Sequence, residues 1–184
     1  MERLNTRWLA PSPSWFKLNF DGTAHSGVAV GGGIIRDNLG NLVLAYARNF
    51  GSALSNMAEA LALFWGLKLA LAIDAKRLII EGDSKMIIEV TKGLSRISWM
   101  INNILKDIWS MIVWLEEFHI QHIYREGNSV ADSLVGAGLE MKAKSERNTG
   151  FNVRLPILSA AYFAEKIMDS VVVQLTNVGI VKEN

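Results

Sequence analysis

The chain has 184 residues, of which half are hydrophobic and 20% are charged, a composition typical of one folded domain with a short extension. Its net charge of +1 means that any nucleic-acid surface would have to be a local patch. It has no cysteine, which excludes a disulfide framework, a thiolate metal site and a cysteine nucleophile.

No segment of the sequence is predicted to enter or cross a membrane. Residues 1–10 lack the apolar core of a secretory signal. The most apolar stretches are interrupted by charges, such as Glu59 and Lys68 in one and Glu165 and Lys166 in another, so none is typical of a membrane span. We therefore expect an intracellular protein of the nucleus or the cytoplasm.

The first part of the chain is predicted to form an antiparallel meander of three strands. Residues 17–21 form the first strand, and glycines punctuate a second strand over 28–36. A turn cluster at 37–41 separates it from a third strand over 42–50. Strands joined by such short loops pair antiparallel.

The remainder alternates helices with strands. A helix rich in Ala, Leu and Met runs from Asn56 to about Ala72, and because it is apolar nearly all round we expect it to be buried on most sides. The later elements are a strand at 77–81, a helix at 85–92, a helix from 97 or 98 to 117, a strand at 118–124 and a helix at 128–144. This order predicts an α/β fold, in which a mixed five-stranded sheet is flanked by helices.

Two extensions are predicted to flank this domain. Residues 1–14 contain two prolines near their end and cannot be helical there, and residues 15–144 form the domain itself. Residues 145–184 begin with a polar linker and include a candidate amphipathic helix at 159–169 and a strand-like run at 171–175. The sequence indicates no function for this last segment.

Four acidic residues lie in apolar surroundings, where an uncompensated charge is costly. Asp21 ends the aromatic first strand, Asp83 follows the strand at 77–81, and Glu59 and Asp132 lie early in two helices. Four acids that converge from two strands and two helices would repel one another, and divalent cations relieve such repulsion. Oxygen ligands without cysteine favour Mg²⁺ or Mn²⁺, and two such ions can bind both the attacking and the leaving oxygen of a phosphodiester.

Each acid taken alone also has a structural interpretation. Asp-Gly pairs are frequent in hairpin turns, and polar or acidic residues are frequent at helix starts. The candidates are a turn at Asp21-Gly22, capping boxes of Asn56 with Glu59 and of Ser129 with Asp132, and a helix cap by Asp83.

Four short motifs follow one another along the chain. They are Phe20-Asp21-Gly22, Asn56-Met57-Ala58-Glu59, Gly82-Asp83-Ser84 and the run from His122 through Asn128 to Asp132. Together with the expected order of elements, they resemble the successive motifs of type 1 ribonuclease H over about residues 15–140. The final run is similar to that of the plant reverse-transcriptase-like branch, known from retrotransposon-derived domains.

This resemblance implies a sheet with strand order 3-2-1-4-5 and an enzyme that cleaves the RNA strand of RNA–DNA hybrids. It implies two Mg²⁺ ions, for which Mn²⁺ can substitute. The residues that it implies as catalytic, metal-binding carboxylates are Asp21, Glu59, Asp83 and Asp132. The residues that we expect to contact the nucleic acid are Ser55, Asn56 and Asn128, by resemblance, and the nearby cations Lys85, Arg96 and Arg125.

Two features depart from the family pattern. Many members carry a catalytic histidine in a flexible loop before the last acid, whereas here His119 and His122 are expected on the last strand, and residues 125–127 fill a shortened loop. The basic handle with which some members grip the hybrid is replaced by scattered cations. Trp99 is the aromatic residue that we retain as a candidate for stacking on a base.

The leading hypothesis is a monomeric, metal-dependent endoribonuclease whose partner is an RNA–DNA hybrid. The alternative is a module that keeps the fold and binds nucleic acid without cleaving it. A third hypothesis, a doubly wound domain for a small ligand, is disfavoured because the sequence lacks a glycine-rich loop between a strand and the helix after it.

Overall fold

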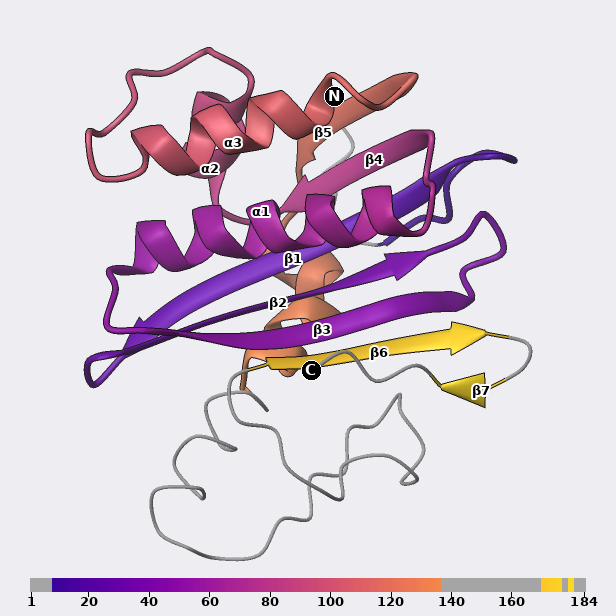
Figure 1. Cartoon of the computed structure of the whole chain (residues 1–184), viewed down its shortest axis with the longest axis horizontal. Coiled ribbons are helices and arrows are strands. Elements are labelled where there is room, and N and C mark those ends of the chain that lie inside the picture. Colours follow the sequence, from indigo (N-terminus) through magenta and orange to yellow (C-terminus); the bar gives the residue numbers. More distant parts are fainter. Residues whose placement is uncertain (1–7, 137–169, 177–178, 181–184) are drawn as a thin grey trace, which may run out of the picture.

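The computed structural model describes residues 8–136, 170–176 and 179–180, and within them a sheet with helices on both faces (Figure 1). The strands are β1 (Phe16–His25), β2 (Val28–Arg36), β3 (Leu42–Gly51), β4 (Arg77–Gly82), β5 (Glu117–His122), β6 (Ser170–Thr176) and β7 (Gly179–Ile180). The helices are α1 (Ser55–Ala72), α2 (Lys85–Thr91) and α3 (Asn102–Ile112), followed by the 3₁₀ turn η1 (Arg125–Asn128) and a helix over 129–136.

The strands lie in the order β5-β4-β1-β2-β3-β6-β7. β1, β2 and β3 form the expected antiparallel meander, while β4 pairs parallel with both β1 and β5. The predicted order 3-2-1-4-5 is therefore confirmed. The strand-like run predicted at 171–175 is β6, which extends this sheet by pairing antiparallel with β3.

β1 extends beyond the strand predicted for it. It continues to His25, and the chain turns at Ser26 and Gly27, whose φ angles are 50° and 77°. Left-handed φ angles at both central residues are typical of a tight hairpin turn. The interpretation of Asp21-Gly22 as the turn is therefore wrong, because both residues lie within the strand.

Two apolar cores hold helices against opposite faces of the sheet. Neighbouring residues of β2 point to opposite faces, and Ile35 belongs to the larger core whereas Ile34 belongs to the smaller. The larger core lies under α1, α2 and α3, and α1 is buried on most sides as predicted. In the smaller core, Leu134 of the helix over 129–136 packs against Ile34 and Ala45.

The helix predicted to end at residue 117 is shorter than expected. The corresponding helix is α3, which begins only at Asn102 and ends at Ile112. The preceding helix α2 ends before Gly93, whose φ angle is 73°. At the other end, the N–H of Glu116 donates to the carbonyl oxygen of Lys76 (2.8 Å), and this contact leads into the pairing of β5 with β4. Strand pairing therefore overrides the helical pattern of the sequence in residues 113–117.

Other predicted helices are described only in part. The helix predicted at 128–144 is α-helical over 129–136, after the 3₁₀ turn that ends at Asn128. Residues 137–144 lie outside the described part of the chain, as does the helix predicted at 159–169. Within the described residues, no helix combines the length and the apolar character needed to span a bilayer.

Candidate metal centre

Three carboxylates from separate elements converge at the carboxyl end of β4. Asp21 lies on β1, Glu59 near the start of α1, and Asp83 directly after β4. One oxygen of each carboxylate lies within 4.8 Å of the other two. Carboxylates at this separation disfavour one another's charged form unless a cation is present. We call these three residues the carboxylate cluster.

Gly22, next to Asp21, allows α1 to approach β1. A Cβ atom at this position would lie 2.4 Å from the backbone carbonyl carbon of Ala58, closer than real side chains come. Only glycine therefore permits the close contact between the strand and the first turn of the helix. This contact brings Glu59 to Asp21.

The acids of the cluster are not helix caps. In the described chain, α1 begins after Leu54 and α2 begins after Ser84, and neither residue forms a side-chain capping hydrogen bond. Asn56 lies inside α1 rather than at its cap position. The capping interpretations of Glu59 and Asp83 are therefore wrong.

Asp21 is buried, Glu59 and Asp83 are half-buried, and the cluster is short of positive charge. Burial, followed by the charges of Asp21 and Asp83, raises the pKa of Glu59 to about 9. Burial, followed by the charges of Asp83 and Asp132, raises the pKa of Asp21 to about 6. Among the described residues, Glu59 Oε2 and Asp83 Oδ1 are buried without a hydrogen-bond partner. Unpaired oxygens of this kind fit a hard divalent cation.

Asp132, the fourth predicted acid, lies beside the cluster and not within it. Its side chain is 47% exposed, and its Oδ1 lies 3.4 Å from Nη2 of Arg125. It is still close enough for its charge to raise the pKa of Asp21, and the charge of Arg125 lowers the pKa of Asp21 and Glu59. The structure therefore brings three of the four predicted acids together and pairs the fourth with an arginine.

Most residues predicted to contact nucleic acid lie at the surface or beside the cluster. Asn56 is close to Glu59 in α1, and its Oδ1 is buried without a partner in the described chain. Trp99, the candidate for stacking, is 85% exposed. The exposed residues predicted to contact phosphates or sugars are Ser55, Lys85, Arg96 and Arg125.

Asn128 differs from the other residues predicted to bind nucleic acid, because it is only 1% exposed. Its Nδ2 donates to the carbonyl oxygen of Phe20 (2.9 Å), and its Oδ1 accepts from Nδ2 of Asn19 (3.4 Å). This burial argues against the direct nucleic-acid contact predicted for Asn128. The side chain instead connects η1 to β1.

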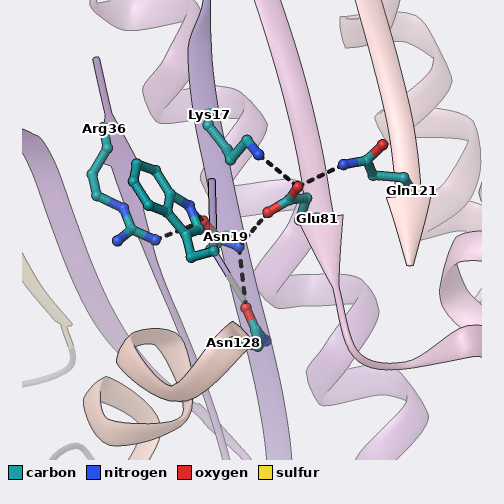
Figure 2. A network of polar contacts seen from close by, with 7 residues as sticks. Lys17, Asn19, Arg36, Glu81, Gln121 and Asn128 are labelled. Atoms are coloured by element: carbon teal, nitrogen blue, oxygen red, sulfur yellow. Dashed lines mark hydrogen bonds and ion pairs between the residues drawn. The ribbon is translucent and has the colours of Figure 1, made fainter. Parts of the chain in front are cut away.

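Asn128 belongs to a set of buried and half-buried polar side chains that the sequence did not predict (Figure 2). At its centre, Nζ of Lys17 lies 2.7 Å from Oε1 of Glu81, and the two side chains are 5% and 4% exposed. We call this set the polar network, and its members are Trp8, Lys17, Asn19, Arg36, Glu81, Gln121 and Asn128. The polar network could have been predicted only from the strand register that places Asn19 beside Glu81. The sequence does not indicate this register.

His122 makes a contact with the carboxylate cluster that the sequence did not reveal. It is the last residue of β5, the strand on which it was predicted, and it pairs there with Gly82 of β4. Its Nε2 lies 3.0 Å from the carbonyl oxygen of Asp83, so the ring donates to the backbone of a cluster residue. His119, in contrast, stacks on Trp15 with the ring centroids 5.0 Å apart.

Sequence comparison finds a family match over most of the described domain. The family model described as "Reverse transcriptase-like" matches residues 19–138. A protein of Arabidopsis thaliana named "Putative ribonuclease H protein At1g65750" is 29% identical over an alignment of 136 residues, which covers 69% of this chain and 21% of that protein. The chain therefore spans about a fifth of the length of that curated relative.

Structure comparison finds the same fold in several ribonucleases H. The N-terminal ribonuclease H domain of Rv2228c from Mycobacterium tuberculosis has a TM-score of 0.68 and 20% identity, over 72% of this chain and 98% of that one. Ribonuclease H1 of Halobacterium salinarum has a TM-score of 0.66 and 22% identity, over 69% and 98%. LC11 ribonuclease H1, solved with an RNA/DNA hybrid, has a TM-score of 0.64 and 23% identity, over 70% and 99%. At such identities the likeness shows the fold alone.

Proposed function

This chain belongs to the reverse transcriptase-like family, and from that membership we propose that it is a metal-dependent endoribonuclease that cleaves the RNA strand of RNA–DNA hybrids. The observation that carries the proposal is the carboxylate cluster, with its oxygens within 4.8 Å of one another and two of them buried without a partner in the described chain. The hybrid is suggested by relatives, because one is named a ribonuclease H protein and another was solved with an RNA/DNA hybrid.

The cluster residues Asp21, Glu59 and Asp83 would hold the metal, with Asp132 beside them. Mg²⁺ is the cation that we propose, with Mn²⁺ as its substitute, because the ligands are all hard oxygens. Two such ions, when bound, supply an activated water and stabilise the departing oxygen in phosphodiester hydrolysis. Glu59 must release a proton to act as a ligand at neutral pH, since its pKa is about 9 without a cation.

The start of α1 is suited to hold the hybrid beside the cluster. A helix N-terminus presents backbone N–H groups that bind phosphate, and Ser55 is exposed there. The side chain of Asn56, which is half-buried in the first turn of α1, is placed to form a hydrogen bond with a 2′-hydroxyl, a group that RNA has and DNA lacks. These contacts would give the preference for an RNA strand.

A module that binds nucleic acid without cleaving it is the second candidate. The ion pair between Arg125 and Asp132 favours it, because the fourth acid is engaged with an arginine and not with the cluster. A cation that enters the cluster would have to compete with Arg125 for this carboxylate.

Cleavage assays distinguish the two candidates. Purified protein is incubated with labelled RNA–DNA hybrid, double-stranded RNA and double-stranded DNA, in Mg²⁺ or in EDTA. The proposal predicts Mg²⁺-dependent cleavage confined to the RNA strand of the hybrid, lost in Asp83→Asn and kept in Asp107→Asn, a control on the exposed face of α3. Hybrid binding in Ca²⁺ without cleavage in Mg²⁺ would favour the second candidate, and neither binding nor cleavage would contradict both.

A further inference from the structure

The polar network has an unusually complete set of hydrogen bonds around Asn19. Its Oδ1 accepts from Nε1 of Trp8 (2.9 Å) and from Nη2 of Arg36 (2.9 Å). Its Nδ2 donates to Oε2 of Glu81 (3.0 Å) and to Oδ1 of Asn128 (3.4 Å). An amide has two donor hydrogens and two acceptor lone pairs, so every hydrogen-bonding position of Asn19 is used.

This arrangement fixes the direction of both buried amides. If the amide of Asn19 were flipped, its NH₂ group would face the N–H donors of Trp8 and Arg36, which cannot accept. Because Asn19 must present its NH₂ group to Asn128, the oxygen of Asn128 faces Asn19 and its own NH₂ group is left for the carbonyl oxygen of Phe20. The donors and acceptors therefore follow one another in a fixed order along a chain of bonds, from Trp8 and Arg36 through Asn19 and Asn128 to the carbonyl oxygen of Phe20.

The last bond of this chain joins the backbones that carry two of the predicted catalytic acids. The carbonyl of Phe20 belongs to the peptide immediately before Asp21, in the middle of β1. Asn128 lies about one helical turn before Asp132, where η1 passes into the helix over 129–136. The bond of 2.9 Å between Asn128 and Phe20 thus fixes the start of this helix beside Asp21.

We propose that the polar network positions Asp132 relative to Asp21, with Asn128 as the positioning residue and Trp8 and Asn19 as the groups that orient it. The proposal rests on the proposed function, because it treats both acids as parts of one metal site. It adds residues outside the family match, since Trp8 and Lys17 precede the matched residues 19–138. In this proposal the side chains act through the backbone and not by direct contact with the substrate or the metal.

A purely stabilising role explains the network less well. A buried ion pair with its associated polar groups is often replaced by apolar residues without loss of stability. Apolar residues cannot fix the orientation of an amide, whereas each hydrogen bond around Asn19 requires a particular donor and acceptor. Supporting bonds of this kind commonly change metal affinity or activity by about 10-fold to 100-fold when they are lost.

The test is Asn128→Asp, which keeps the size of the side chain and its acceptor toward Asn19 but cannot donate to Phe20 when its carboxyl group is ionised. Mg²⁺ is titrated while the melting temperature is followed, and hybrid cleavage is measured over the same range. We expect the half-saturating Mg²⁺ concentration to rise about 10-fold or more and kcat to fall, with KM for the hybrid little changed. Thr91→Val is the matched control, because it removes one buried hydrogen bond (Oγ1 to the Ile87 carbonyl, 2.7 Å) in α2. It should lower the melting temperature and leave the Mg²⁺ titration unchanged.

A second variant keeps the test decisive if Asn128→Asp does not fold. Trp8→Phe removes the donor to Asn19 but keeps a ring against Arg36, which lies 3.7 Å from the indole centroid. It should shift the Mg²⁺ titration in the same direction by a smaller factor. Variants that lower the melting temperature as Thr91→Val does, with the wild-type response to Mg²⁺, would overturn the positioning role.

The outcomes for the wild-type protein separate this inference from the proposed function. A wild type that binds Mg²⁺ without cleaving the hybrid refutes the proposed function, and the melting titration then decides the positioning role by itself. A wild type whose melting temperature does not respond to Mg²⁺ would overturn both.

Discussion

Two successive pairs of polar or acidic residues, one member of each on β1 and the other on β4 or directly after it, lie in opposite electrostatic environments. The first pair is Asn19 and Glu81, which face each other in the parallel register. The second pair, two residues further along each segment, is Asp21 and Asp83. Glu81 is 3% exposed, and its carboxylate accepts from Lys17 and from two side-chain amides. Asp21 is 7% exposed and faces other acids.

The difference between the pairs shows what marks a site in this fold. Burial alone does not, because the carboxylate of Glu81 is as buried as that of Asp21 and is part of the framework. The chain supplies the buried Lys17 to the first pair, whereas the cation whose charge lowers the pKa of Asp21 is the exposed Arg125, which is paired with Asp132. Buried negative charge that the protein does not compensate is what a divalent cation would compensate.

The largest expected effect comes from breaking the compensated pair. Lys17→Met should lower the free energy of unfolding by about 3–5 kcal/mol, because Glu81 is then a buried charge without its cation. Urea unfolding measures this change. Lys17→Met combined with Glu81→Leu should recover most of the loss, and a double variant no more stable than Lys17→Met would show that the ion pair is not the source.

Neutralising either member of the uncompensated pair, Asp21 or Asp83, should reduce activity without reducing the stability of the metal-free protein. Asp21→Asn and Asp83→Asn should each reduce Mg²⁺-dependent hybrid cleavage by more than about 100-fold, because the loss of a ligand exceeds the loss of a residue that only supports one. In EDTA each variant should melt at or above the wild-type temperature, since one repelling charge is gone. A variant that cleaves at the wild-type rate would remove that residue from the site.

The raised pKa values predict how metal-free stability depends on pH. The pKa of Glu59 rises from 4.5 in the unfolded chain to about 9 in the folded protein, and that of Asp21 rises from 3.8 to about 6. At a pH between the unfolded and the folded pKa of either group, the folded state binds more protons than the unfolded state. The free energy of unfolding in EDTA should therefore fall as pH rises from about 5 to 9. Glu59→Gln should flatten the upper part of this profile. An unchanged slope in this variant would mean that Glu59 ionises freely.

The smallest effect is expected from the surface cations. With Lys85→Ala and Arg96→Ala combined, hybrid binding in Ca²⁺ should weaken, and the slope of log K against log salt should become shallower by up to about 2. The preference for hybrid over double-stranded DNA should not change, because we assign it to Asn56. A steep slope that this double variant leaves intact would place the phosphate contacts elsewhere.

The sequence predicted the elements better than the contacts between them. The strand order was implied by the resemblance to type 1 ribonuclease H, and the buried helix followed from its apolar composition. Asp21, Glu59 and Asp83 stood out as acids in apolar segments. Lys17 and Asn19 did not, because polar residues that alternate with apolar ones in a strand are usually interpreted as its solvent-facing side. Their partner Glu81 is more than 60 residues away in the sequence, and only the register of β1 with β4 brings them together.

Proton release on Mg²⁺ binding tests most directly whether the carboxylate cluster receives the cation. Calorimetric titration of the protein with Mg²⁺ at pH 7, in buffers of different ionisation enthalpy, measures the protons released per chain. Because Glu59 is protonated at this pH and must ionise to bind, we expect the release of about one proton, which disappears in Glu59→Gln. Mg²⁺ binding without proton release, or the same release in Glu59→Gln, would contradict the account.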